Sequence, residues 1–169
     1  MATAAAEILE LEKPRWSYVR EQADRLTAPY SVPPIPVLEI AERTGVDVVF
    51  NPFDQFADTV AGFCDFAAKR LYINSQDPLN RQTFTIAHEL GHWILHREYF
   101  EAHPDRYHVL PRFQEVEASD AFEKEANHFA ANLLVPKRLL TPVKQAPVAA
   151  LANAFAVSQA MMEYRLRNV

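Results

Sequence analysis

Apolar residues recur at helical spacing in several stretches of the chain. Residues 15–27 place apolar side chains three or four positions apart between two prolines, which predicts a helix. A short apolar helix is expected over 37–44, with Gly45 as its C-terminal cap. A further helix is expected from about Ser119 to Val135, and two short helices are expected within 148–168.

Shorter apolar runs bounded by turn residues predict strands. "VDVVF" at 46–50 is one, and residues 60–66 and 69–74 form a strand pair joined by a tight turn. The strand "KRLYIN" either presents an edge to an extended substrate or is a plain core strand. A long helix then begins at Asp77-Pro78, with Asp77 as its N-cap, and runs to about Tyr99.

The order of helices, small sheet and helices indicates an α+β fold, with helices packed on a small, mostly antiparallel sheet. The 169 residues contain no repeat and no long linker, so a single domain is expected over 1–169. It would include an N-terminal helix over 14–28 and a helical segment over 148–169 packed on the rest. The composition, 49% apolar and 23% charged, is that of a globular protein.

The net charge, the cysteine count and the N-terminal sequence limit the classes of partner and the cell compartment that we expect. A formal net charge of −5 argues against nucleic-acid binding through charge alone. The single cysteine, Cys64, excludes an internal disulfide and suits a reducing cytoplasm. The first residues lack the basic start and apolar core of a signal peptide, and no stretch approaches a membrane span. A cytoplasmic protein without membrane or direct nucleic-acid contact is therefore expected.

The stretch "TIAHELGHWILH" at 85–96 contains the candidate metal-binding and catalytic residues. His88 and His92 lie one helical turn apart on one face, and Glu89 lies beside them, the H-E-x-x-H pattern of a zinc site with a glutamate base. Alternatively, all three groups are core polar residues with buried partners. His96 lies about 12 Å along the helix from His88, too far to share one ion, and is either structural or a neighbour of the site.

A third ligand is expected from the helix over 119–136, because two protein ligands are too few for zinc. Glu125 borders the apolar stripe of that helix, where a carboxylate needs a cation. Glu123, at the other edge of the stripe, and His128, on the side of Glu125, are the competitors. Without the H-E-x-x-H pattern, Glu125 would be interpreted as a solvent-exposed charge on the helix face.

These stretches resemble the ImmA/IrrE family of metallopeptidases. The resemblance lies in "NRQTFTIAHELGHWILH" at 80–96 and "EKEANHFAANLLVP" at 123–136, with support from residues 37–50, 61–74 and 157–166. It implies a gluzincin-like site with one Zn²⁺ on His88, His92 and Glu125 and with Glu89 as general base. It also implies a stand-alone domain, encoded by a bacterium or phage, that acts on a helix-turn-helix repressor in a stress response or belongs to a toxin–antitoxin pair.

The expected function is therefore zinc-dependent hydrolysis of a peptide bond in a protein substrate. Four residues are candidates for the oxyanion donor: Tyr72, Tyr107, His108 and His128. One rival is a metal-containing protein that sequesters a toxin or repressor without cutting it. Another is DNA binding through residues 151–169, although only Arg165 and Arg167 are basic there and packing on the core is favoured.

Overall fold

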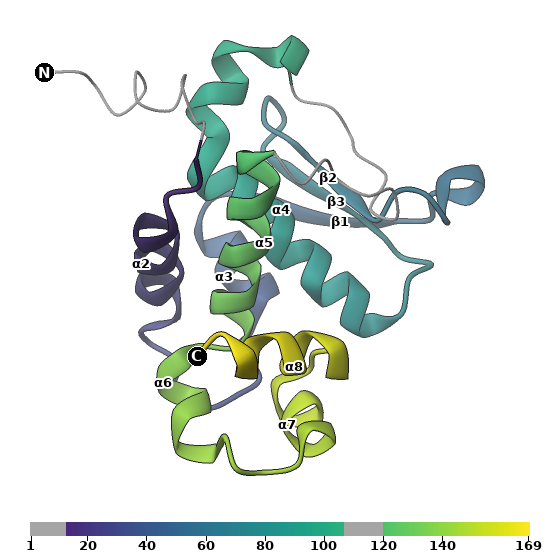
Figure 1. Cartoon of the computed structure of the whole chain (residues 1–169). Coiled ribbons are helices and arrows are strands. Elements are labelled where there is room, and N and C mark those ends of the chain that lie inside the picture. The colour runs from purple at the N-terminus through teal and green to yellow at the C-terminus, as the bar shows by residue number, and fades with distance from the viewer. Residues whose placement is uncertain (1–12, 107–119) are drawn as a thin grey trace, which may run out of the picture.

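The computed structural model describes residues 13–106 and 120–169 (Figure 1). Its elements follow in the order α2 (Trp16–Thr27), α3 (Val37–Arg43), β1 (Asp47–Asn51), η1 (Asp54–Phe56), β2 (Gly62–Asp65), β3 (Arg70–Asn74), α4 (Leu79–Ala102), η2 (Pro104–Arg106), α5 (Ala121–Leu134), α6 (Lys137–Leu140), η3 (Thr141–Val143), α7 (Val148–Phe155) and α8 (Gln159–Arg167). The α+β architecture predicted from the sequence is confirmed.

The three strands form one small mixed sheet in the order β1-β3-β2. β2 and β3 pair antiparallel, as the tight turn between them predicts, whereas β1 pairs parallel with β3. The sheet is thus evenly mixed instead of mostly antiparallel. Because β3 is the central strand, "KRLYIN" offers no free edge, and β1 and β2 are the edge strands of the sheet.

Helix α4 is the centre of the molecule and lies between the sheet and α5 (Figure 1). It begins at Leu79, one residue later than predicted, because Pro78 has an extended ψ of 151° and serves as the N-cap. Asp77 is therefore not the cap, and its carboxylate lies 3.6 Å from Nη1 of Arg81. The helix continues to Ala102, three residues beyond the predicted end.

Helix α5 packs between α4 and α2 (Figure 1). Its N-cap is Asp120, whose carboxylate accepts from the backbone N–H groups of Phe122 and Glu123 at 2.9 and 3.3 Å. Such a cap satisfies amides that the first helical turn leaves without partners. The cap fixes the start of α5, and with it the position of Glu123 in the first turn.

The C-terminal segment forms α7 and α8, as predicted, with Ala156 in the left-handed conformation between them. Phe155 and Met162 are buried in the core. Arg165 is buried as well, and it donates to the carbonyl of Val135 and to Oδ1 of Asn132 at 2.9 and 3.0 Å. One of the two basic residues available for DNA binding is thus used inside the fold.

None of the helices in the described part of the chain is both long enough and apolar enough to cross a membrane.

Candidate metal centre

Two imidazoles and one carboxylate meet between α4 and α5. Nε2 of His88 lies 3.0 Å from Oε2 of Glu123, and Nε2 of His92 lies 2.9 Å from Oε1 of the same residue. The three ligand atoms of this group lie within 4.8 Å of one another. His88 and His92 are buried, and Glu123 is half-buried at the first turn of α5.

The carboxylate beside the histidine pair is therefore Glu123 and not Glu125, the residue expected from the apolar stripe. Residues two apart on a helix point in directions roughly 200° apart. Since Glu123 faces His88 and His92, Glu125 does not reach the pair and instead contacts the next histidine of α4, His96. The structure brings together two of the three expected ligands and replaces the third with its competitor.

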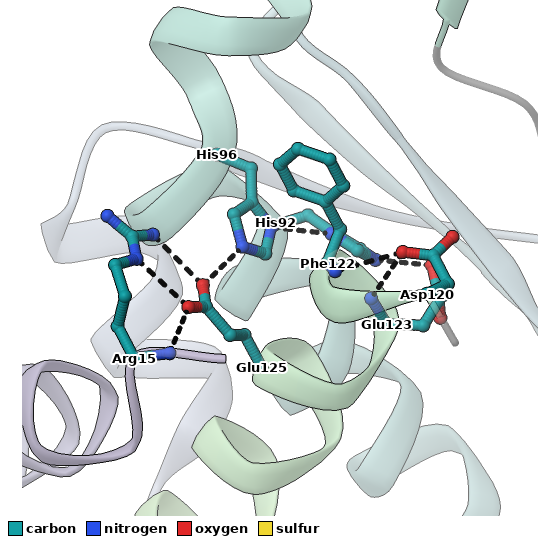
Figure 2. A network of polar contacts seen from close by, with 7 residues as sticks. All are labelled: Arg15, His92, His96, Asp120, Phe122, Glu123 and Glu125. Carbon is teal, nitrogen blue, oxygen red and sulfur yellow. Dashed lines mark hydrogen bonds and ion pairs between the residues drawn. The ribbon is translucent and has the colours of Figure 1, made fainter. Parts of the chain in front are cut away.

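Glu125 instead lies in a hydrogen-bond network with Arg15 and His96 (Figure 2). Its Oε1 accepts from the backbone N–H of Arg15 at 2.7 Å and from Nε at 2.9 Å. Its Oε2 accepts from Nη2 of Arg15 at 2.9 Å and lies 2.8 Å from Nε2 of His96. The buried carboxylate of Glu125 does pair with a cation, as its burial predicts, but this cation is the guanidinium of Arg15 and not a metal ion.

Each imidazole of the pair has a partner on its other nitrogen. Nδ1 of His88 lies 2.8 Å from Oδ1 of Asn127, and Nδ1 of His92 lies 2.9 Å from Nδ1 of His96. Partners of this kind orient the imidazoles that bind metals. Asn127 was not predicted as a site residue, although it follows Glu123 by four positions and so shares its helix face. Arg15 was not predicted either, because no local pattern connects it to this site.

His92 and Glu123 shift each other's pKa. Burial alone would lower the pKa of His92, but the charge of Glu123 and its hydrogen bond outweigh burial and raise that pKa. Burial would likewise raise the pKa of Glu123, whereas the two histidines hold it far below its usual range. The carboxylate is thus ionised, as a metal ligand must be.

Glu89 is buried at 6% exposure on the turn of α4 that holds the pair. Its charge lies close enough to Cys64 on β2 to help raise the pKa of that thiol, although burial is the larger cause. It also acts on the pKa of His92. The charge of Glu89 therefore acts both on His92 of the pair and on the thiol of β2.

The structure places the expected oxyanion donors differently. Tyr72 stacks on Phe63 at 4.9 Å, while the buried neighbours of Tyr72 on β3 occupy the opposite face of the sheet. His128 packs edge-on against Trp16 of α2 at 4.9 Å. Tyr107 and His108 lie outside the described residues. Neither described candidate therefore lies against the histidine pair.

A hollow of about 430 Å³ opens one helical turn before the pair, where the start of α4 faces the junction of α7 and α8. Phe84, Val157 and Met161 supply much of its apolar wall. The ring of Phe84 also lies 6.3 Å from that of His88. Phe84 thus lies between this hollow and the first histidine of the pair, which does not itself line the hollow.

The chemistry of the donor set fits a zinc ion. Two imidazole nitrogens and one carboxylate oxygen converge, and both imidazoles have a partner on the nitrogen that points away. Three protein ligands leave one coordination position open, which is the composition of catalytic zinc sites and not of structural ones.

The fold of this chain resembles that of a known protein. None of the curated proteins matches the chain. A solved structure, a transcriptional regulator from Mycobacterium tuberculosis, aligns with a TM-score of 0.61 at 19% sequence identity. The alignment covers 86% of this chain but 45% of the regulator, so the chain spans less than half the length of that protein. At this identity the likeness establishes the fold alone.

The sequence itself carries the closer relationship. Residues 41–167, which contain both helices of the metal centre, match the peptidase M78 family, described as the IrrE N-terminal-like domain. The resemblance drawn from the two helical motifs is thereby confirmed: the chain belongs to this family of metallopeptidase-like domains.

Proposed function

We propose that the protein is a zinc-dependent endopeptidase whose single metal ion is held by His88, His92 and Glu123. The observation that carries the proposal is the convergence of both Nε2 atoms on the carboxylate of Glu123, at 3.0 and 2.9 Å. Membership of a metallopeptidase-like family supports it. Desolvating the Glu123 carboxylate next to two imidazoles costs free energy unless the carboxylate pairs with a cation.

Glu89 is the proposed general base. A zinc ion at this site supplies Lewis-acid chemistry, because it polarises the scissile carbonyl and makes water easier to deprotonate. Glu89 takes the proton from the attacking water and then delivers it to the nitrogen of the leaving amine. The burial of Glu89 keeps bulk water away from the carboxylate and lets it exchange that proton with the reacting groups.

We propose further that the substrate is a protein of transcription control, and in particular a helix-turn-helix repressor. A solved protein of this fold is a transcriptional regulator. The net charge of −5 favours encounter with a basic, DNA-binding partner. The hollow beside Phe84 offers apolar space for a side chain of the bound segment.

Metal content and cleavage, measured together, test the assignment of roles. Glu123→Ala removes a ligand and should lose most of its zinc after dialysis, and its cleavage with it. Glu89→Gln is nearly isosteric but cannot accept a proton, so it should keep zinc and the fold while turnover falls by roughly 10²–10⁴. Full zinc in Glu123→Ala would remove Glu123 from the ligand set, and undiminished turnover in Glu89→Gln would remove Glu89 from the mechanism.

A further inference from the structure

A chain of buried hydrogen bonds leads from His92 to the start of α2 (Figure 2). Nδ1 of His92 lies 2.9 Å from Nδ1 of His96, and Nε2 of His96 lies 2.8 Å from Oε2 of Glu125. Arg15 then donates to the Glu125 carboxylate from three nitrogens. His96 and Glu125 are both 0% exposed, so this carboxylate and this imidazole are satisfied by protein groups.

The chemistry of these groups fixes where each proton lies. Glu125 faces Arg15 and is ionised, so it can only accept, and Nε2 of His96 must donate to it. A neutral imidazole carries one proton, which leaves Nδ1 of His96 bare and able only to accept. The proton between the two rings therefore belongs to Nδ1 of His92.

This order of protons matters at the metal site. In the zinc-free protein the ionised Glu123 can only accept, so Nε2 of His92 also carries a proton, which a zinc ion has to displace. If Nδ1 keeps the proton that it donates to His96, the loss of the Nε2 proton leaves a neutral His92 with its Nε2 lone pair free for the metal. The reverse order would place the proton on Nε2 of His92 and block that atom as a ligand. An acceptor at the position of His96 thus selects the form of His92 that can bind zinc.

We propose that His96, oriented by Glu125 and Arg15, is a positioning residue that holds His92 in its metal-binding tautomer. The inference rests on the proposed metal-dependent function. Arg15 precedes residues 41–167, the part of the chain that matches the family, so the network ties the beginning of α2 to the metal centre. Its outermost member is thus supplied by a segment outside the family match.

The test compares two substitutions of His96 by zinc affinity, measured in competition with a chelator. His96→Leu removes the acceptor and should weaken zinc binding by roughly 10–100-fold. In His96→Gln the amide oxygen accepts from His92 and the amide nitrogen donates to Glu125, so affinity should return towards the wild-type value. The matched control is Asn132→Leu, which removes another buried polar group whose partners are Arg165 and the carbonyl of His128.

Two further measurements distinguish a positioning role of His96 from a general loss of protein stability. Asn132→Leu should lower the melting temperature of the zinc-free protein but leave zinc affinity unchanged. Nitrogen-15 NMR of the imidazoles should find the proton of His96 on Nε2 in the wild type. Wild-type zinc affinity in His96→Leu, or a proton on Nδ1 of a neutral His96, would overturn the inference alone. A wild-type protein that binds no zinc would overturn the proposed function and the inference with it.

Discussion

Glu123 and Glu125 are the same residue type, two positions apart, with opposite electrostatic roles. Glu125 is neutralised by the guanidinium of Arg15 and by a hydrogen bond to His96. Glu123 faces only imidazoles among its ion-pair partners in the described structure, and imidazoles become ligands when they lose their protons. At the residue scale, the carboxylate available to a metal ion is therefore the less buried of the two.

The network around His96 should make the stability of the zinc-free protein depend on pH. Burial is the main cause that lowers the pKa of His96 to about 4, from an ordinary value of 6.5. Between these values the unfolded chain binds a proton that the folded protein does not, so stability falls as pH falls from 6.5 to 4. The slope contributed by this one group is at most about 1.4 kcal/mol per pH unit.

Urea unfolding of zinc-free wild type and of His96→Gln across this window measures that contribution. The pKa of His92 is raised, so its effect on the pH dependence of stability has the opposite sign. Because His92 is present in both proteins, this effect largely cancels when their stabilities are compared. Glu125, with its pKa lowered to about 2, loses its contribution only below its ordinary value of 4.5. An equal pH slope for the two proteins between 6.5 and 4.5 would contradict the assignment of a buried, neutral His96.

The residues of the site were predictable to different degrees, for physical reasons. His88, Glu89 and His92 follow from a spacing set by the helix itself, so one stretch is enough to find them. Glu123 and Glu125 both contact histidines of α4, so the choice between them depends on how α5 lies along α4 and on which carboxylate already has a cation. That depends on Arg15, which is 110 residues from Glu125 in the chain, and no local pattern carries this information.

At the scale of elements, the metal centre depends on how closely α4 and α5 approach. Gly91 lies within the H-E-x-x-H turn, and a Cβ at this position would come within 3.2 Å of Cα of Ala126 and 3.1 Å of the ring of Phe129. Both contacts are tight, and one is to backbone. Glycine at position 91 thus sets the distance across which Glu123 meets the histidines.

Gly91→Val should therefore separate α4 from α5 and weaken zinc binding as well as the fold. Overpacking of this kind costs about 1–3 kcal/mol of unfolding free energy. The matched control is Gly45→Ala, which strains a positive φ of 97° at a position with open space around it. Both variants should lower the melting temperature, but only Gly91→Val should lower zinc affinity. Equal zinc affinity in the two variants would show that the spacing of the helices is not limiting.

Helices and strands could be located from local patterns, but their arrangement could not. The apolar periodicity predicted five helices, α2, α3, α5, α7 and α8. The short turn predicted the pairing of β2 with β3. The parallel pairing of β1 with β3 escaped prediction because the two strands are separated by other elements and no turn fixes their register. The start of α4 was misplaced by one residue because Pro78 suits both the N-cap and the first helical position.

At the scale of the molecule, α2 and α5 pack together, and α8 binds the end of α5 through Arg165. These contacts support the proposal that residues 1–169 act as one domain. A regulator of the same fold is more than twice as long as the aligned segment, so the domain occurs within a larger regulatory protein. At this scale the proposed cleavage of a repressor and its rival, sequestration of a repressor without cleavage, predict different products.

The two outcomes differ in what remains after zinc-loaded protein is mixed with a candidate helix-turn-helix repressor. An endopeptidase should give two fragments, because Glu89 and the metal centre act on a peptide bond of the bound chain. Removal of zinc by a chelator, or Glu89→Gln, should abolish the fragments, while Glu89→Gln should still bind the repressor. A sequestering protein should instead give an intact, stoichiometric complex that forms equally well with Glu89→Gln. Mass spectrometry of the products and size-exclusion chromatography of the mixture decide between them, and an uncut repressor in complex with zinc-loaded wild type would refute cleavage of that partner.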